Sequence, residues 1–248
     1  MHKWLLLTLA LGTSLWALPL DKKSVQQAAR QVWKNECSGT IEGLTSWNVG
    51  EDFPSLGIGH FIWYKPGQKG RFSESFPDLV KFLEEHGQAV PDWLKHGCPW
   101  ASREEFLADR NGPRLTALRQ LLSSTVDLQA EFMAARLNAA LPRILKETDQ
   151  GDKVEARFKR VFQAPGGLYP LLDYVNFKGE GISKTERYQG QGWGLLQVLE
   201  NMKDLDDPLH DFAQAAHKMM DRRVANSPPE RNEQRWLRGW HNRINSYE

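Results

Sequence analysis

The sequence predicts an α+β fold that is mostly helical, with a small β-sheet lobe near the N-terminus. Three patterns support this prediction. Residues 24–36 carry apolar side chains at helical spacing, residues 40–64 hold short aromatic and β-branched runs between turn residues, and the patterns beyond residue 77 are helical almost to the end. Because the strands precede nearly all the helices, we expect a β-rich and a helical part with a cleft where they meet.

Capping, glycine and proline residues set the expected bounds of the individual helices, strands and loops. A capping box of Ser24 and Gln27 opens the helix over 24–36, which ends at the following glycine. Strands are expected in GLTSW and SLGIGHFIWY, and KPGQKGRFSESFP is a surface loop. A second capping box, Ser102 with Glu105, opens a helix over 102–110. Further helices are expected at 79–85, 113–123, 125–146, 153–162, 169–177, 194–203, 208–223 and 230–245.

Residues 1–17 have the pattern of a secretory signal peptide. A short basic start precedes an apolar run from Trp4 to Trp16, and Ala17 offers a small residue for cleavage. The run is shorter than the roughly 20 residues that span a membrane, which favours cleavage over an uncleaved anchor. We therefore expect residues 18–248 to form one domain of a periplasmic or secreted monomer without a stable membrane anchor.

Charge does not indicate a nucleic-acid partner. The formal net charge is +1 at pH 7. The basic stretch from Lys218 to Arg243 suits an anionic polymer, but a solvated helix face explains it as well. The sequence has no Gly-rich phosphate loop, paired zinc-ligand spacing or RNA-binding aromatic signature, so we expect no nucleic acid, metal or organic cofactor.

The two cysteines, Cys37 and Cys98, would remain after export. An oxidising compartment favours one disulfide between them, and buried reduced thiols are the alternative. A bridge would fix the backbone beside Glu36 to the HGCPW loop.

Glu36 is the candidate for acid–base chemistry. It lies near the C-terminus of its helix, where the negative end of the macrodipole predicts a raised pKa. A carboxyl group that is protonated near neutral pH can act as a general acid in glycoside hydrolysis, which needs a second carboxylate or a positioned water. Glu51 and Asp52 are candidates for the second role. The alternative is an exposed helix end followed by two solvated acids.

The stretch WKNECSGTIEGLTSWNVGEDFPSLGIGHF, residues 33–61, resembles the phage-type lysozymes (endolysin muramidases) of the lysozyme-like superfamily. In that family a short helix ends in the catalytic glutamate, and a hairpin leads to a Thr-x-Gly-x-Gly-His segment, here SLGIGH. YVNFKGEGISKTERYQGQGWGLLQVLENM and DFAQAAHKMMDRRVANSPPERNEQRWLRGWHNRI are similar to the family's later and closing helices. The resemblance implies a lysozyme-like fold.

The resemblance also implies roles for single residues. Glu36 would be the general acid, and Ser55 would position the attacking water. Gly57 and Gly59 would allow close packing. His60 is counted among the substrate-binding residues because it would orient the hairpin by hydrogen bonding.

The aspartate that the family carries in its hairpin has no clean counterpart here. The aligned position falls near Asn48, which leaves Glu51 and Asp52 as candidates for the second catalytic carboxylate. The opposite wall of the cleft is expected to bind substrate through Asn176, Glu180, Tyr188 and Gln197. Sugar subsites lined by Trp47, Trp63 or Trp193 are a further expectation, although most tryptophans should be core.

The expected function is that of an exported muramidase that cleaves the β-1,4 bond between N-acetylmuramic acid and N-acetylglucosamine, with peptidoglycan as its partner. GEGISKTERYQGQGWGLLQV also resembles lytic transglycosylases, which use one glutamate and give 1,6-anhydro products; that chemistry would make Glu180 the acid and Gln197 its support. A non-catalytic peptidoglycan-binding envelope protein is the remaining alternative.

Overall fold

A computed structural model describes residues 20–70 and 72–248 of the chain. The predicted signal peptide lies outside the described residues. Within them, no helix combines the length and apolar character needed to cross a membrane.

The N-terminal part holds α1 (Lys22–Cys37), a 3-10 turn (Glu42–Leu44) and three two-residue strands. The strands β1 (Thr45–Ser46), β2 (Ser55–Leu56) and β3 (Phe61–Ile62) form an antiparallel sheet in the order β1-β2-β3. Thr45 pairs with Leu56, and Ser55 pairs with Ile62. This confirms the prediction of a small sheet within residues 40–64.

The remainder of the described chain is mostly helical, which confirms the α+β, mostly helical class. Short 3-10 turns follow at Asp92–Lys95, Pro229–Arg231 and Asn245–Tyr247. The helices are α2 (Phe76–Glu85), α3 (Arg103–Ala108), α4 (Pro113–Ser124), α5 (Val126–Lys146), α6 (Gly151–Gln163), α7 (Leu168–Lys178), α8 (Leu195–Asn201), α9 (Pro208–Asn226) and α10 (Gln234–Ile244).

The cap of α1 differs from the prediction. Asp21 is the N-cap, and its carboxylate accepts from the backbone of Ser24, so the predicted Ser24–Gln27 capping box is not the N-terminal cap. A preceding carboxylate can satisfy the free N–H groups as well as a serine hydroxyl does. At α3, Ser102 does accept from Glu105 N, whereas the Glu105 carboxylate accepts from Ala101 N. The predicted N-cap is thus confirmed at α3 and wrong at α1.

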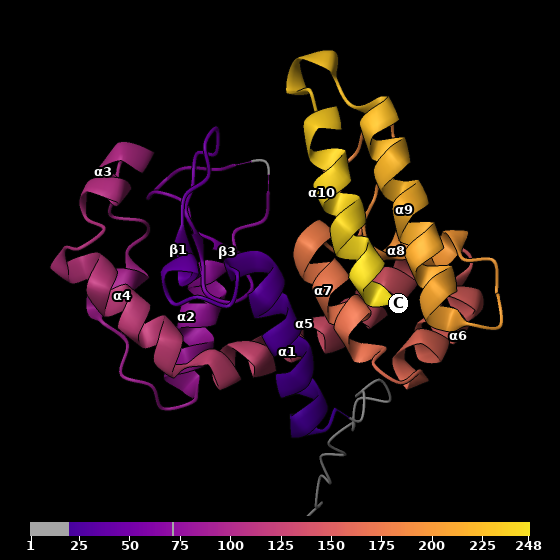
Figure 1. Cartoon of the computed structure of the whole chain (residues 1–248), viewed down its shortest axis with the longest axis horizontal. Coiled ribbons are helices and arrows are strands. Elements are labelled where there is room, and N and C mark those ends of the chain that lie inside the picture. The colour runs from indigo at the N-terminus through magenta and orange to yellow at the C-terminus, as the bar shows by residue number, and fades with distance from the viewer. Residues whose placement is uncertain (1–19, 71) are drawn as a thin grey trace, which may run out of the picture.

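Two groups of elements meet across α1 and α5. Figure 1 shows the strands with α2, α3 and α4 on one side and α6 to α10 on the other. The long helix α5 packs against α1 and α2 as well as α6 and α7, so it joins the two groups. One apolar core extends through both, and within it the rings of Trp63, Trp93 and Trp100 pack edge to face or tilted. This arrangement places the C-terminal end of α1 at the junction.

Candidate functional site

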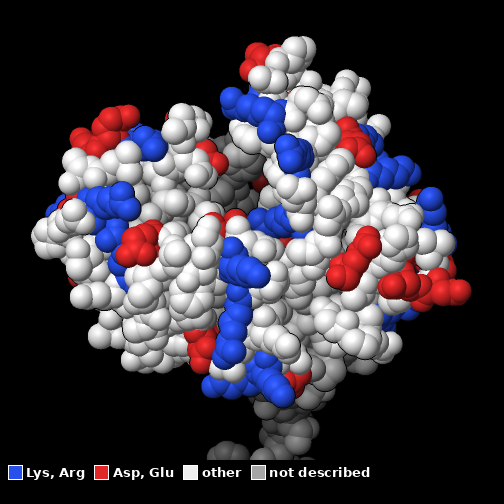
Figure 2. Space-filling model, viewed as in Figure 1, with Lys and Arg blue, Asp and Glu red and all other residues white. Residues whose placement is uncertain are grey.

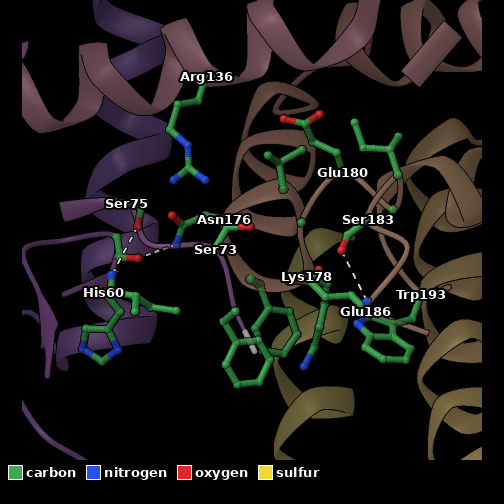
Figure 3. Close-up of a pocket in the computed structure, with 18 of the residues that line it drawn as sticks. His60, Ser73, Ser75, Arg136, Asn176, Lys178, Glu180, Ser183, Glu186 and Trp193 are labelled. Atoms are coloured by element: carbon green, nitrogen blue, oxygen red, sulfur yellow. Dashed lines mark hydrogen bonds between the residues drawn. The ribbon is translucent and has the colours of Figure 1, made fainter. Parts of the chain in front are cut away.

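A cavity of about 520 Å³, here called the central cavity, lies at this junction. Gly59, His60 and Ile62 line it from the sheet, Arg136 and Arg143 from α5, and residues 175–183 from α7 and the loop that follows. The space-filling view shows the surface hollowed between the two groups of elements (Figure 2). Figure 3 shows side chains that enter the cavity from both sides. The cleft predicted between the sheet and the later helices is therefore present.

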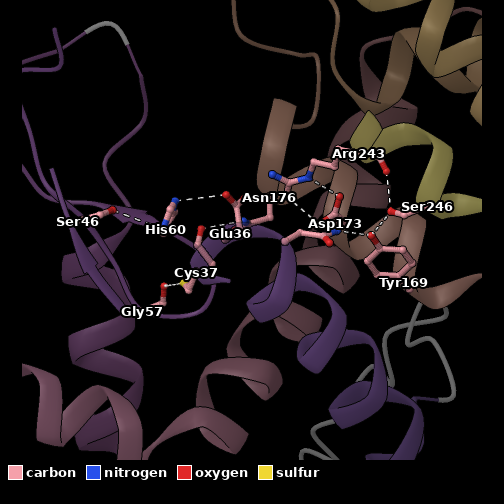
Figure 4. Close-up of polar contacts among 12 residues, drawn as sticks. Glu36, Cys37, Ser46, Gly57, His60, Tyr169, Asp173, Asn176, Arg243 and Ser246 are labelled. Carbon is pink, nitrogen blue, oxygen red and sulfur yellow. Dashed lines mark hydrogen bonds and ion pairs between the residues drawn. The ribbon is translucent and has the colours of Figure 1, made fainter. Parts of the chain in front are cut away.

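Glu36, the penultimate residue of α1, contacts His60, which lines this cavity. Its Oε1 contacts Arg243 Nη2 at 2.7 Å, and its Oε2 contacts His60 Nδ1 at 3.3 Å. Figure 4 shows the carboxylate between His60 from the sheet side and Arg243 from α10. The side chain is 14% exposed. Glu36 is therefore neither a solvated helix end nor sealed inside the core.

The prediction of a raised pKa for Glu36 is wrong. Burial acts in that direction, but the charge of Arg243 and the contacts with His60 outweigh it and hold the pKa well below its usual range. A guanidinium in direct contact affects a carboxylate more strongly than the partial charge of a helix end. In the free protein Glu36 is thus an ionised carboxylate.

His60 is held as a cation by its hydrogen bonds. The Ser46 hydroxyl donates to the backbone oxygen of Ser55 at 3.3 Å, so its oxygen can accept from His60 Nε2 at 3.4 Å. Because Nδ1 faces the Glu36 carboxylate, both ring nitrogens act as donors, which is the imidazolium form. Burial lowers the pKa of His60, but the contacts with Cys37 and Glu36 raise it to about 10.

The turn that carries His60 needs its two glycines. Gly57 has φ +70°, and a Cβ there would lie 2.4 Å from Gln129 Oε1. A Cβ on Gly59 would meet a neighbouring ring at 2.7 Å. The buried Gln129 of α5 accepts from the backbone next to Gly57 at 2.9 Å, and Asn176 Nδ2 donates to Gly59 O at 2.7 Å. The close packing predicted for the glycines is confirmed, and Asn176 both lines the cavity and holds the turn.

Arg243 is fixed from behind by Asp173. Its Nε and Nη2 donate to the two oxygens of Asp173 at 2.8 and 2.7 Å, and Tyr247 OH donates to the same carboxylate at 2.6 Å. Asp173 is completely buried. Sequence reasoning placed Arg243 only in a basic stretch and missed Asp173, although one acid in the apolar helix LYPLLDYVNFK is a signal for a buried ion pair.

The other predicted catalytic residues are placed differently. Glu51 is partly buried and accepts from Asn48 Nδ2 at 3.0 Å. Burial raises the pKa of Glu51, although the hydrogen bond from Asn48 and the charge of His60 oppose this shift. Asp52 is exposed. Ser55 is buried in β2 and supports Ser46 through its backbone oxygen.

Of the predicted opposite wall, Asn176 and Glu180 line the cavity, and Glu180 forms a salt bridge with Arg143. Tyr188 and Gln197 do not line it. The Tyr188 hydroxyl donates to Glu233 at 2.7 Å in the core. Gln197 accepts from Gly194 N at 3.0 Å and thereby caps the start of α8. Trp193 lines the cavity while largely buried, whereas Trp47 and Trp63 are core.

The predicted disulfide is not formed, and Cys37 and Cys98 are both buried free thiols. Cys37 Sγ donates to Gly57 O at 3.4 Å, and Cys98 Sγ donates to Trp100 O at 3.7 Å. Each thiol thus packs in its own part of the core. Burial raises the pKa of Cys98 to about 12, which suppresses the thiolate that oxidation requires.

Other ligand sites are less developed. A second cavity of about 540 Å³ lies at the start of α1, and the single charged side chain in its described lining is Asp21, which caps the helix. Within residues 20–70 and 72–248 no group of three or more His, Cys, Asp or Glu residues is arranged to hold a metal ion. The described lining of the central cavity, in contrast, holds several ionisable side chains, among them His60, Lys178 and Glu180.

No protein-family model matches the chain, and comparisons with curated proteins and with solved structures return no match. A functional interpretation therefore depends on the residues and geometry of the cavity.

Proposed function

We propose that this protein is a peptidoglycan-cleaving glycosidase that acts on the β-1,4 bond between N-acetylmuramic acid and N-acetylglucosamine. The observation that carries the proposal is the Glu36 carboxylate, which lies near the end of α1 and is paired with His60, a residue that lines a cavity of about 520 Å³. Small-ligand sites commonly measure ~300–1,000 Å³. The order of helix-end glutamate, short hairpin and Gly-x-Gly-His supports the substrate class through the resemblance to phage-type lysozymes.

The proposed chemistry divides the work between two carboxylates whose pKa values are shifted in opposite directions. Glu51, with a raised pKa, would donate its proton to the glycosidic oxygen as the C–O bond breaks. Glu36, ionised beside Arg243 and His60, would stabilise the positive charge that develops on the sugar and accept the proton of the incoming hydroxyl group. This reverses the role that the sequence suggested for Glu36.

The direct test is the digestion of purified peptidoglycan by the protein and two variants. Glu36→Gln removes the charge and keeps the shape, and we expect its cleavage rate to fall by about 10²–10⁴-fold. The matched control is Glu155→Gln, which removes the carboxylate of another salt bridge, with Lys159 on α6, outside the cavity lining and should retain most activity. Equal rates for the protein and Glu36→Gln would contradict the assignment.

The same digestion tests the chemistry and the proposed proton donor. Mass analysis of the products separates hydrolysis, which leaves reducing ends, from transglycosylation, which leaves 1,6-anhydro ends. Glu51→Gln should lower the rate by a similar factor and remove the fall of activity at high pH, because it removes the group that must be protonated. A normal rate and pH profile in Glu51→Gln would exclude Glu51 as the donor.

A second candidate function is peptidoglycan binding without cleavage. It is favoured by one specific observation: both oxygens of Glu36 already have cationic partners, which a purely structural ion pair would also show. Under this alternative the protein would sediment with peptidoglycan sacculi but release no fragments. The product analysis separates the two functions.

A further inference from the structure

A buried lysine lies on the wall of the central cavity. Lys178 is the last residue of α7, lines the cavity and is 8% exposed. Among the described residues its amine has no hydrogen-bonded acceptor and no carboxylate within salt-bridge distance. A buried ammonium group usually has an anionic partner, because its desolvation is otherwise uncompensated.

The amine is instead enclosed in a stack in which three cations alternate with three aromatic rings: Arg243, Phe177, Lys178, Trp240, Arg223 and Trp193. Lys178 Nζ lies 3.8 Å from the centre of the Phe177 ring and 3.7 Å from that of Trp240. Arg243 Cζ covers Phe177 at 4.1 Å, and Arg223 Cζ lies 4.8 Å from Trp240. Ring faces attract cations but do not neutralise them.

The carboxylates around the stack are bound to its two arginines. Arg243 contacts Glu36 and Asp173, and Arg223 is paired with Glu233 at 2.8 Å. The amine at the centre of the stack is left without an anion in contact.

A second cation of this kind enters the cavity from α5. Arg136 is partly buried, and among the described residues its guanidinium has neither an ion pair nor a hydrogen bond. Its neighbour Arg143 is paired with Glu180. Figure 3 shows Arg136 and Lys178 on different sides of the cavity. The unneutralised charge that these two side chains supply to the lining is positive.

We propose that the central cavity binds a carboxylate group carried by the sugar substrate, attracted by the positive charges that Lys178 and Arg136 place on its lining. The sugar part rests on the proposed function, and the carboxylate part rests on the two cations. In peptidoglycan the shared chemistry has two sources, the lactyl ether of muramic acid and the peptide attached to it.

Electrostatics around the amine agree with this assignment. Burial lowers the pKa of Lys178 well below its usual range, and Arg223 and Arg243 act in the same direction, while Glu233 and Glu36 oppose it. A bound carboxylate would favour the protonated amine. Ligand binding should therefore raise the pKa of Lys178, which the pH dependence of the affinity measures.

The test uses a ligand that lacks the bond proposed to be cleaved. The disaccharide N-acetylglucosamine-β-1,4-N-acetylmuramic acid and its methyl ester are titrated into the unmodified protein and followed by calorimetry or NMR. Because charge-assisted hydrogen bonds are among the stronger polar contacts, we expect the acid to bind about 10- to 100-fold more tightly than the ester. Adding a peptide to the lactyl group, with a free or amidated end, identifies the source of the carboxylate.

Three variants assign the contact. Lys178→Met keeps the packing between the rings, and we expect it and Arg136→Met each to lose most of the preference for the acid. The control Lys34→Met removes an equal charge from an exposed position of α1 outside the cavity lining and should keep the preference.

Equal affinity for acid and ester, absence of binding at millimolar ligand, or a preference that survives in both cavity variants would overturn the inference. A protein that prefers the acid but releases no fragments from peptidoglycan would retain the anion site and lose the proposed function. A protein that cleaves peptidoglycan without preferring the acid would retain the proposed function and lose the anion site.

Discussion

Glu36 and Glu233 are both carboxylates held by arginines, but they differ in how completely they are satisfied. The Glu233 side chain is fully buried and accepts hydrogen bonds from three residues. Arg223 donates to it at 2.8 and 3.0 Å, Arg231 at 2.9 Å and Tyr188 at 2.7 Å. Burial alone would raise the pKa of Glu233, but these partners lower it to about 2.

Glu36 has fewer partners and a more open position. Arg243 and His60 each contact one oxygen, the side chain is partly exposed, and the central cavity begins at His60. Its arginine is shared, because Arg243 also holds Asp173 through two hydrogen bonds. A saturated carboxylate in the core indicates a structural role, whereas an unsaturated one beside a cavity has lone pairs left for a ligand.

The largest loss of stability is expected when the fully satisfied carboxylate, Glu233, is changed. Glu233→Gln leaves the buried Arg223 and the partly exposed Arg231 without their counter-charge and should lower the free energy of unfolding by about 3–5 kcal/mol. Glu36→Gln should lower it by only about 1–3 kcal/mol, because Arg243 keeps Asp173. Urea denaturation of both variants measures the difference. If Glu36→Gln were as destabilising as Glu233→Gln, the distinction between a structural and an available carboxylate would fail.

A second prediction concerns how the stability that the ion pair of Glu36 and His60 provides depends on pH. The pKa of His60 is raised from 6.5 to about 10, so its stabilisation is complete below pH 6.5 and is lost as the pH rises toward 10. The loss should be on the order of a few kcal/mol and should shrink in Glu36→Gln.

NMR titration checks this assignment and has an internal control. Burial and the neighbouring His241 lower the pKa of His217, so His217 should titrate below the usual range and His60 above it. A His60 that titrated near 6.5 in the folded protein would show that the Glu36 ion pair is weak in solution.

A smaller effect is expected from the turn that carries His60. Gly57→Ala combines a left-handed backbone, φ +70°, with a clash against Gln129, and should cost about 2–3 kcal/mol. Gly50→Ala is the matched control: its φ is +83°, but nothing lies within 4 Å of the added Cβ, so strain alone should cost about 1 kcal/mol. Thermal unfolding of the two variants compares them. Equal losses would show that the turn is not held by its packing.

Local patterns in the sequence predicted the secondary structure, because helices and strands depend mainly on residues close in the chain. Apolar spacing and turn residues placed the helices and the three strands within a few residues, and the end of the helix at Glu36 was placed correctly. Asn176 and Glu180 were assigned to a cavity with His60 by the family resemblance rather than by local pattern, and all three line it.

The charge state of Glu36 was not predictable in this way. It depends on Arg243, which follows about 200 residues later and whose position is set by the packing of α10. The helix end, a local feature, gave the opposite sign of the pKa shift. Tyr188 and Gln197 show the same limit, since a polar side chain near a cleft in sequence can turn into the core to satisfy Glu233 or cap a helix.

The smallest predicted effect is that of a reductant on stability. It tests whether a disulfide fixes the backbone beside Glu36. A disulfide would tie Cys37, next to Glu36, to Cys98, and its reduction would typically cost about 2–5 kcal/mol. With both thiols free and buried, a reductant should leave the unfolding midpoint unchanged, and unfolded protein prepared without reductant should titrate two thiols. The folded protein should resist alkylation at Cys98, whose pKa burial raises to about 12. A midpoint that falls on reduction would mean that a covalent link, rather than Arg243 and His60, fixes the carboxylate at the cavity.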